Sequence, residues 1–465
     1  MSTIRTVTVV GGGISGLTAA YYLRRAGVEC TVMERDAAPG GTMKTVHEDG
    51  WLVETGPNSA LETTPLFGEM FLGLGIAEER LYADPAADRR YILRGGRLHP
   101  LPMSPQAFLA SSLWTFRGKA RLLKEPFVGR AAREETIAEF VERRLGREFL
   151  DYAINPFVAG VYAGNPEQLS VQAAFPRLYA LEEKYGGLVK GMIRGARERK
   201  QRAETAKDRA RMFSFKNGMA TFPAAAGRSL GDRLWLQCSA EEIVHMPDGR
   251  FLVRALKKGV PTELAADALV IAVPAHTAGR LIRPLSAAAA DVLGEIFYPP
   301  VAEVFLGFPA AAMTRPLDGF GFLIPAKEGR NILGTIWSSS LFPGRAPAGH
   351  VALTTFVGGS RQPRLAGLDE GELVRTVVAE LRSIMGVAGD PVYAKVIRWE
   401  RAIPQYNIGY RTAMQQIDAL EKQMPGLFFC SNFRGGIAVG DCVMSGEKTA
   451  CRITGGVPVE VSSTT

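Results

Sequence analysis

The sequence predicts an α/β protein with a Rossmann-like nucleotide-binding domain, a second domain built on a mixed sheet, and a helical lobe. Three observations predict this fold. The chain opens with a βαβ pattern that carries a glycine fingerprint. The apolar run Ala268–Pro274 is typical of a buried strand that returns to the nucleotide-binding sheet. Residues 301–357 form a succession of alternating strand-like segments, whereas residues 101–215 have a helical composition.

The first unit spans Val7–Glu34. A short β-branched strand stops at Gly11-x-Gly13-x-x-Gly16, and a helix and a second strand follow. Gly11 permits the tight turn, Gly13 lets backbone N–H groups approach a pyrophosphate, and Gly16 lets the helix pack closely on the strand. The helix N-terminus favours an anion. We therefore expect a dinucleotide here, with Glu34 accepting hydrogen bonds from the ribose hydroxyls.

A second glycine-rich segment comes directly after the acid. Arg35 begins the pattern R-x(4)-GG, which ends at Gly40-Gly41, and the segment Glu54–Ser59 follows. This order of acid, arginine and glycine pair resembles the extended nucleotide motif of flavin amine oxidases, in which the second glycine pair meets the phosphates. Taken alone, Gly40-Gly41 could be an ordinary turn. The resemblance implies FAD.

Length and composition set limits on the remaining chain. With 465 residues the chain is too long for one hydrophobic core, so we expect two or three lobes. Five cysteines show neither metal-ligand spacing nor a dense disulfide framework, which predicts a reducing compartment and no metal site. We find no apolar run long enough to cross a bilayer and no room for a targeting peptide before the first strand, so we expect a cytoplasmic protein.

The positive charge is concentrated in one segment. The net charge is +8, and Arg177–Lys216 contains twelve Lys or Arg against five Asp or Glu. A solvated helical face, nucleic acid or an anionic membrane surface could each account for this segment. No nucleic-acid-binding motif accompanies it, so we expect no nucleic-acid partner.

Four further segments carry local signals. Residues 60–76 have helical spacing, and Arg89–Leu98 reads as a hairpin around Gly95-Gly96. Two prolines and two glycines in Asn155–Pro166 predict a break in the helical lobe, either a plain turn or a site where free carbonyls meet a ligand. Near the C-terminus a strand, the pair Gly435-Gly436 and a helix predict a second helix N-terminus, aimed at the N1 and C2-oxygen region of the flavin.

Together these motifs resemble the protoporphyrinogen oxidase family of flavoenzymes, over residues 7–453. The motifs that carry the resemblance are ETGPNSALE (54–62), RRYILRGGRLHPLP (89–102), FVAGVYAGNPEQLSV (157–171), GFGFLIP (319–325), LGTIWSSSLFP (333–343), TTFVGGSRQP (354–363) and IPQYNIGY (403–410). The resemblance implies an FAD-binding domain of the p-hydroxybenzoate hydroxylase/amine oxidase type (1–75, 217–280 and 425–460), a substrate domain (76–100 and 285–424) and a helical membrane-docking lobe (101–216).

The same resemblance implies roles for particular residues. Arg90 would bind a substrate propionate, with Arg89 as its solvated neighbour. Leu323 and Ile336 would sandwich one pyrrole ring, and Phe356 would stack on another. The carbonyl of Gly160 would face the pyrrole N–H groups, and Asn58 would approach the reacting carbon and the flavin. The implied FAD-binding residues are Gly11, Gly13, Ile14, Ser15, Gly16, Glu34, Arg35, Gly40, Gly41, Thr42, Gly56, Pro57, Asn58, Ser59, Val244, Trp399, Asn432, Gly436 and Val439.

The implied reaction is oxidation of protoporphyrinogen IX with O₂ as acceptor, giving protoporphyrin IX and H₂O₂. None of the five histidines is among the residues assigned to the reacting face, so a shaped pocket and oriented carbonyls would promote the reaction. Where amine oxidases carry a lysine, the strand reads VAEVFLGF (301–308), and no lysine lies between Gly259 and Ala326. No cysteine lies between Cys238 and Cys430, so we expect non-covalent FAD.

Two alternatives stay open: oxidation of coproporphyrinogen III, and a non-catalytic, flavin-stabilised porphyrin carrier. The resemblance also implies peripheral contact with the inner face of an anionic membrane, ferrochelatase as a partner, a homodimer, and sensitivity to diphenyl-ether herbicides.

Overall fold

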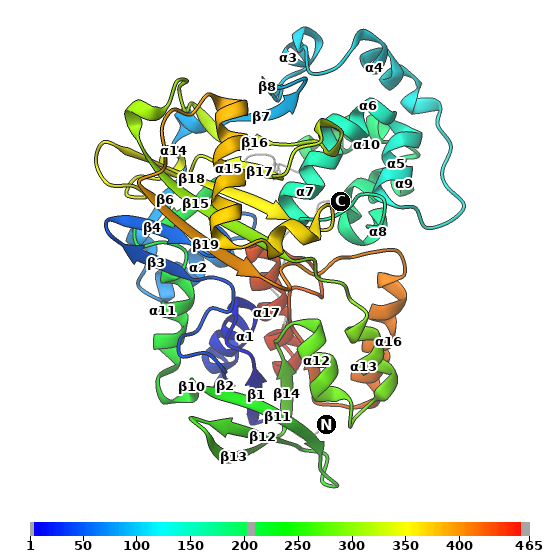
Figure 1. Cartoon of the computed structure of the whole chain (residues 1–465). Helices are drawn as coiled ribbons and strands as arrows, with labels where there is room; N and C mark the ends of the chain where they lie inside the picture. Colours follow the sequence, from blue (N-terminus) through cyan, green and yellow to red (C-terminus); the bar gives the residue numbers. More distant parts are fainter. Residues whose placement is uncertain (1–3, 202–209, 457–465) are drawn as a thin grey trace.

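The nucleotide-binding half forms the lower part of the molecule, and the seven-stranded sheet and the helical lobe lie above it (Figure 1). The structure is a computed structural model that describes residues 4–201 and 210–456. Part of the basic segment 177–216 therefore lies outside the described residues. Within the described ranges, no helix is both long and apolar enough to cross a membrane.

A five-stranded parallel sheet forms the centre of the nucleotide-binding half. Its order is β10 (Leu234–Trp235), β2 (Glu29–Met33), β1 (Thr6–Val10), β14 (Ala268–Ile271) and β20 (Leu427–Phe429). Val7 of β1 pairs with Ala268 of β14, which confirms the predicted return of that strand. The sheet is buried on both faces, as expected for parallel strands that helices cover.

Helices α1 (Ile14–Arg25) and α17 (Val439–Thr454) pack side by side in this half. Their approach is close because Gly446 of α17 has no side chain: a Cβ there would lie 2.7 Å from the Ser15 carbonyl oxygen. The other helices here are α2 (Leu66–Gly73), α11 (Thr221–Leu230), α12 (Ala275–Ile282), α13 (Ala287–Gly294) and α16 (Tyr410–Gln423). Three small antiparallel sheets complete it: β3 (Thr45–Glu48) with β4 (Trp51–Glu54); β5 (Ala60–Leu61), β9 (Met212–Phe215) and β6 (Arg80–Tyr82); and β11 (Cys238–His245), β12 (Phe251–Lys257) and β13 (Val260–Ala266).

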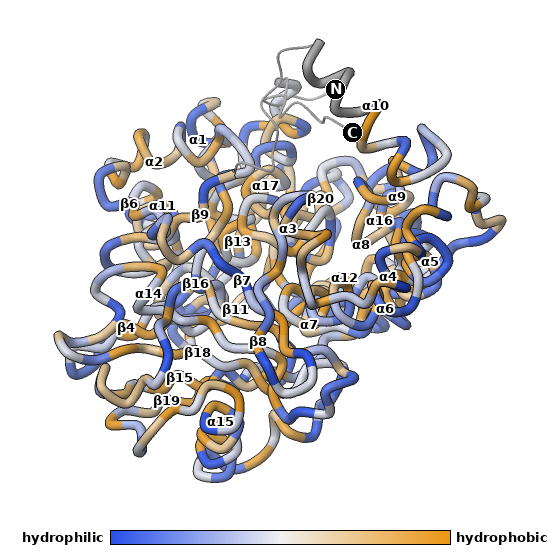
Figure 2. Tube along the Cα trace, turned by 90° about the horizontal axis from the view of Figure 1, so that it is seen from above, coloured by the Kyte–Doolittle hydropathy of each residue, from blue (hydrophilic) through white to orange (hydrophobic). Residues whose placement is uncertain are grey.

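The second large element is a mixed seven-stranded sheet. Its order is β19 (Tyr393–Trp399), β15 (Val301–Pro309), β18 (His350–Gly358), β17 (Gly334–Ile336), β16 (Gly319–Leu323), β7 (Arg89–Arg94) and β8 (Arg97–Pro100). One face packs against α15 (Glu370–Met385), which Figure 2 views end-on beside β15, β18 and β19. Ala302, Val304 and Leu306 lie in this core. Since side chains alternate along a strand, Val301, Glu303 and Phe305 point to the opposite face.

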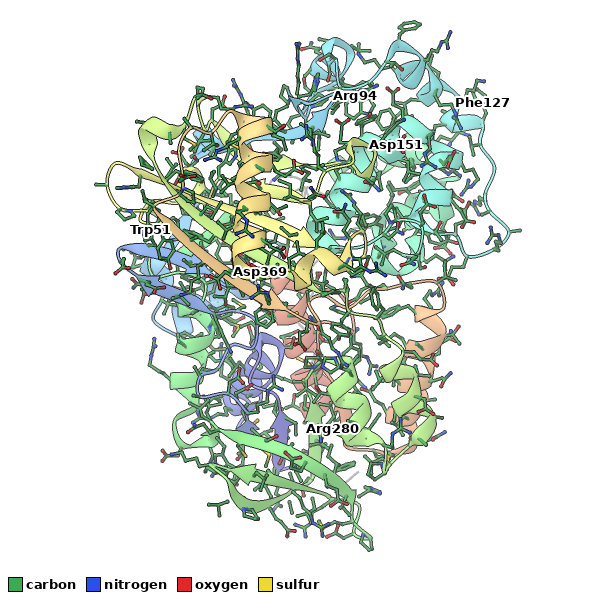
Figure 3. The ribbon with its side chains drawn as sticks, in the orientation of Figure 1. Trp51, Arg94, Phe127, Asp151, Arg280 and Asp369 are labelled. Atoms are coloured by element: carbon green, nitrogen blue, oxygen red, sulfur yellow. The ribbon has the colours of Figure 1, made fainter. Side chains whose placement is uncertain are left out.

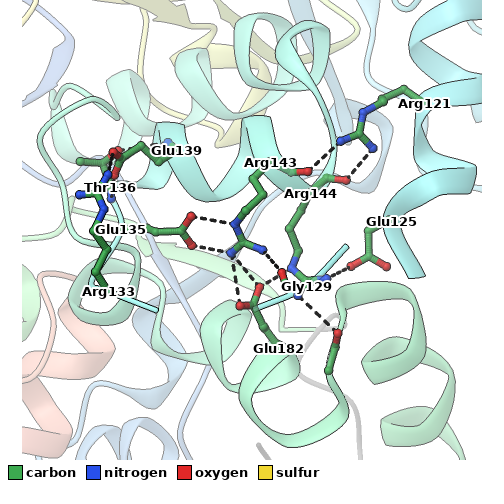
Figure 4. A network of polar contacts seen from close by, with 11 residues as sticks. Arg121, Glu125, Gly129, Arg133, Glu135, Thr136, Glu139, Arg143, Arg144 and Glu182 are labelled. Carbon is green, nitrogen blue, oxygen red and sulfur yellow. Dashed lines mark hydrogen bonds and ion pairs between the residues drawn. The ribbon is translucent and has the colours of Figure 1, made fainter. Parts of the chain in front are cut away.

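The helical lobe is held together by a buried ionic network (Figure 4). Its helices are α3 (Pro105–Ala110), α4 (Phe116–Arg121), α5 (Ile137–Arg144), α6 (Arg147–Phe149), α7 (Asn155–Tyr162), α8 (Val171–Ala174), α9 (Pro176–Tyr185) and α10 (Leu188–Gln201). The fully buried Arg144 binds Glu125 at 2.7 Å and also contacts Glu182. Glu125 accepts hydrogen bonds from the backbone N–H groups of Leu188 and Val189, so it caps α10.

The structure corrects three predicted elements. The predicted break at Asn155–Pro166 is wrong for its first half, because Asn155–Tyr162 is the helix α7 and Pro156 stands in its first turn, where proline is tolerated. The chain leaves the helix only at Ala163, which is left-handed. The predicted helix 60–76 begins instead as strand β5. Finally, the helical region ends in strand β9, which pairs with β5 and β6.

Candidate active site

The loop after β1 has the geometry of a pyrophosphate cradle. Gly11 has φ +112°, and a Cβ there would lie 2.7 Å from the Ala272 carbonyl oxygen. At Gly16 a Cβ would lie 2.1 Å from the Gly11 carbonyl oxygen. Gly13, in contrast, faces open space next to the start of α1, since a Cβ there would meet nothing within 4 Å. The backbone N–H groups beside Gly13 are therefore open to an anion.

The Glu34 carboxylate is oriented so that it can accept hydrogen bonds from a ligand. One carboxylate oxygen accepts from the backbone N–H of Gly12 at 2.7 Å, and the other accepts from that of Asp36 at 2.8 Å. Two backbone donors fix the carboxylate at the end of β2 and leave its remaining lone pairs for ribose hydroxyls. Arg35 next to it is exposed.

The second glycine pair packs onto the first loop. Gly40 donates its N–H to the Gly12 carbonyl at 2.8 Å, and Gly13 and Gly40 form a parallel bridge. A Cβ on Gly56 would lie 2.1 Å from the Thr42 carbonyl oxygen, so the segment 56–59 must pass against this loop. These residues fit the phosphates of a dinucleotide and the start of a flavin ring.

The start of α1 packs against the middle of the C-terminal helix α17, at Gly446. Gly436 has φ +137°, and Val439 is the first residue of α17. Tyr406 fixes the approach to this helix: its hydroxyl donates to the Asn432 carbonyl at 2.5 Å and accepts from the Gly436 N–H at 3.2 Å. Burial raises the pKa of Tyr406 well above the usual value, so the hydroxyl keeps its proton.

Strand register brings the predicted substrate residues to one face of the seven-stranded sheet. Leu323 pairs with Gly334, which pairs with Phe356. Two residues along, Arg90 pairs with Gly321, which pairs with Ile336. Residues opposite one another in a sheet share a face. The predicted residues Arg90, Leu323, Ile336, Phe356 and Trp399 therefore lie on the face away from α15.

The loop 55–59 is attached to this face at two points. Trp399 donates its indole N–H to the Thr55 carbonyl at 2.7 Å. The side-chain amide of Asn58 donates to the Gly56 carbonyl at 3.2 Å and to Glu303 at 3.1 Å. Asn58 and Ile336 line the same small cavity of about 10 Å³. The structure thus joins the predicted flavin loop to the predicted substrate face.

Helix α7 packs against the same face. A Cβ at Gly160 would lie 2.6 Å from a methyl carbon of Leu323, so a larger residue here would force the Leu323 side chain to move. Gly160 is exposed and lies in the last turn of α7, where carbonyls have no partner within the helix. A carbonyl that meets the substrate was predicted at Gly160, and this role stays a prediction.

Arg361 and Ala163 fix the position of α7. The half-buried Arg361 donates to the Ile324 carbonyl at 2.8 Å and to the side-chain oxygen of Asn155 at 2.9 Å, at the start of α7. At the other end, Ser360 donates its N–H to the Ala163 carbonyl at 2.7 Å. The motifs FVAGVYAG and TTFVGGSRQP therefore meet in space.

Arg90 and Arg89 differ in their charge partners. Arg89 is paired with Asp318 at 2.6 Å. Arg90 is exposed, lies 5.8 Å from the centre of the Phe320 ring, and has no ion pair among the described residues. An unpaired guanidinium at the edge of the face is available to a carboxylate ligand.

Sequence reasoning missed two buried acids beside the site. Glu303 is 2% exposed, and burial, followed by the nearby Glu54, raises its pKa to about 8, although the Asn58 amide opposes this shift. Burial likewise raises the pKa of Glu54 to about 7. The sequence signal that could have identified Glu303 is its place within the apolar strand 301–308, because an acid is rarely buried without a partner. Val244 lies on β11, half-buried, and its proximity to adenine stays a prediction.

Comparison with known proteins places this site in a family. The sequence profile of the family "Flavin containing amine oxidoreductase" matches residues 14–454. The chain is 34% identical to protoporphyrinogen oxidase 2, chloroplastic/mitochondrial, of Arabidopsis thaliana, over 96% of this chain and 93% of that protein. The chain belongs to the flavin-containing amine oxidoreductases, together with the protoporphyrinogen oxidases. Its cofactor is FAD, which the cradle at Gly13 and the carboxylate of Glu34 fit.

Other relatives cover the chain equally well. The chain is 29% identical to protoporphyrinogen oxidase of Bos taurus, over 98% of this chain and 99% of that protein. It is 27% identical to coproporphyrinogen III oxidase of Bacillus subtilis, over 95% and 96% respectively. The fold is also that of reduced UDP-galactopyranose mutase, with a TM-score of 0.74 at 15% identity over 99% of this chain and 98% of that one.

Proposed function

We propose that the chain is an enzyme that oxidises protoporphyrinogen IX to protoporphyrin IX with FAD and O₂. The observation that carries the proposal is the single sheet face on which Arg90, Leu323, Ile336 and Phe356 lie, opposite α7 and next to the flavin loop. An apolar face with one free cation at its edge suits a flat tetrapyrrole that carries propionates.

The chain's own contribution to this reaction is shape, orientation and charge. When bound, FAD would supply a two-electron acceptor, and O₂ would take those two electrons and two protons to give H₂O₂. Each turnover would remove one hydride equivalent from a meso C–H bond and one proton from a pyrrole N–H, which goes to solvent. Leu323, Ile336 and Phe356 hold the macrocycle, and the helix-end carbonyl at Gly160 orients the pyrrole N–H groups.

Coproporphyrinogen III is the second candidate substrate, since a relative carries that name. It has four propionates, and we expect it to need more cations than protoporphyrinogen IX needs. Arg90 is unpaired, whereas Lys395, on the same face, is paired with Glu48 at 2.5 Å. This pairing favours the substrate with two propionates.

We also propose that the helical lobe docks on an anionic membrane surface through α3, α4 and the turn that follows. Five large apolar side chains there are mostly exposed, and Phe127 lies at the outer edge of the lobe (Figure 3). They are Met103, Leu109, Phe116, Leu123 and Phe127. Exposed apolar groups interleaved with Arg117 and Lys124 suit the headgroup boundary. Two protein partners remain proposed: ferrochelatase, which would take the porphyrin product, and a second copy of the chain. Diphenyl-ether herbicides remain proposed inhibitors.

The test is absorbance of the purified FAD-loaded protein mixed with protoporphyrinogen IX and, separately, with coproporphyrinogen III. We expect bleaching of the flavin without O₂, and growth of the porphyrin Soret band with H₂O₂ in air, faster for the first substrate. Faster reaction with the second substrate would make the chain a coproporphyrinogen oxidase. Binding of tetrapyrrole without bleaching would leave only a carrier.

A further inference from the structure

The side-chain amide of Asn58 has a fixed orientation. Its N–H₂ group donates to the Gly56 carbonyl and to Glu303, at 3.2 and 3.1 Å. The Gly56 carbonyl can only accept, so the nitrogen must face it. Both N–H hydrogens are thereby engaged. The amide oxygen of Asn58 is left as an acceptor, and Asn58 is only half-buried.

Glu303 lies behind Asn58, out of solvent. It is 2% exposed, and its cross-strand neighbour on β18 is Phe356. Among the described residues, the titratable groups that act on it are Glu54, from β4, and beyond Glu54 the buried Arg345, 4.0 Å from the Glu54 carboxylate. Glu54 accepts from the Thr45 hydroxyl and from the Met219 N–H, so it has its own partners. Within the described part of the chain, Asn58 is the only side chain recorded as a hydrogen-bond partner of the Glu303 carboxyl.

We propose that Glu303 is a positioning residue of this active site, which orients and polarises the Asn58 amide so that its oxygen accepts from the pyrrole N–H that loses a proton. This inference rests on the proposed function. Loss of hydride leaves positive charge on the macrocycle. An ionised Glu303 strengthens the amide oxygen as an acceptor through the shared hydrogen-bond chain, and so stabilises that charge. The carboxylate never touches the substrate; it acts through Asn58.

The proposal gives the reaction a specific pH dependence. Because burial holds the carboxyl protonated up to about pH 8, the ionised form appears only as pH rises through that value. We therefore expect kcat to rise through about pH 8 in the natural protein. Glu303→Gln keeps an oxygen that accepts from Asn58 but cannot ionise, so its kcat should stay flat over the same range.

Three variants separate positioning from folding. Glu303→Leu removes the acceptor and should lower kcat for protoporphyrinogen IX by about 10- to 100-fold with KM changed less than about threefold. Glu303→Gln should stay within about threefold of the natural kcat at about pH 6. The control, Glu380→Gln, removes a buried acid on α15, on the other face of the same sheet, and should leave kcat and its pH profile unchanged.

A readout without turnover identifies the titrating group. In infrared difference spectra of the FAD-loaded protein between about pH 6 and pH 10, the carbonyl bands of protonated Glu54 and Glu303 should disappear as pH rises through about 7 and about 8 respectively. Glu303→Gln should lack only the band that disappears at about pH 8. A rising kcat in Glu303→Gln, or an unchanged kcat in Glu303→Leu, would overturn the proposal while the natural protein still bleached with substrate. Failure of the natural protein to bleach would instead overturn the proposed function.

Discussion

Glu303 on β15 and Phe356 on β18 are directly opposite one another in the seven-stranded sheet. One is a buried acid that binds the Asn58 amide in the flavin loop, and the other is the predicted stacking partner of a pyrrole ring. The same row continues through Gly334 to Leu323, against which Gly160 of α7 packs. A single row of side chains therefore connects the loop that would hold FAD with the helix that would cover the substrate.

Arg90→Ala should weaken use of protoporphyrinogen IX and leave flavin content intact. A lost charge-assisted hydrogen bond costs on the order of 1.5 to 3 kcal/mol, which is about 10- to 150-fold in kcat/KM. Arg89→Ala is the matched control, because Arg89 already pairs with Asp318. Steady-state kinetics of both variants give kcat/KM, and flavin absorbance gives their FAD content. Equal losses in the two variants would remove the carboxylate role from Arg90.

Gly160→Ala should reduce substrate use through crowding. The new methyl group would lie 2.6 Å from a Leu323 methyl carbon, so Leu323 must move toward the predicted pyrrole site. We expect kcat/KM to fall by about tenfold or more with the FAD spectrum unchanged. Leu323→Val should restore part of the activity in the Gly160→Ala background. If Gly160→Ala alone matches the natural protein, α7 does not border the substrate.

The sequence predicted the nucleotide-binding half well because local patterns specify it. Strand, glycine spacing and helix lie within Val7–Glu34, so one short segment contains the whole signal. The pairing of β1 with β14 is long-range, yet an apolar run predicted it because parallel central strands are buried on both faces.

The sequence could not predict how the site is assembled across the sheet. The break expected at Asn155–Pro166 was wrong for its first half, because a proline in the first helical turn resembles a helix breaker when only the sequence is known. The contact of Glu303 with Asn58 joins residues 245 positions apart, which no periodicity reveals. Strand register decides such contacts, and register depends on packing of the complete sheet.

Membrane contact should depend on the exposed apolar side chains of α4 and the turn after it. Burial of one such side chain contributes about 1.5 to 3 kcal/mol, so the combined change Phe116→Ser, Leu123→Ser and Phe127→Ser should lower binding to vesicles of phosphatidylglycerol and phosphatidylcholine by more than about tenfold. A matched triple change to serine at Leu72, Leu256 and Val260, which are also exposed, should leave binding to these vesicles unchanged. Cosedimentation at low and high salt measures both variants. Equal binding by the two would place the docking surface elsewhere.

Arg144→Met should destabilise the helical lobe. The change leaves Glu125 buried without its cation and leaves Glu182 with Arg143 alone, which costs about 3 to 5 kcal/mol. Arg147→Met is the control. The Arg147 side chain is 60% exposed and its ion pairs lie at the surface, so its loss should cost less than about 1 kcal/mol. Hydrogen exchange of residues 137–185 should rise in the first variant only. Equal protection in both would mean that the buried network does not hold the lobe together.

The stability of the protein should fall with pH through the ionisation of Glu303. Its pKa is about 8 in the folded protein against an ordinary value of 4.5, so the folded state binds the extra proton between these values. The stabilising contribution is complete below about pH 4.5 and is lost as pH rises through about 8. Glu303→Gln has no such proton to lose. We therefore compare the free energy of unfolding of Glu303→Gln minus that of the natural protein at two pH values. This difference should be larger at about pH 9 than at about pH 5, by on the order of a few kcal/mol. Denaturant unfolding at both pH values measures this difference, and a difference that does not change with pH would show that Glu303 is ionised throughout.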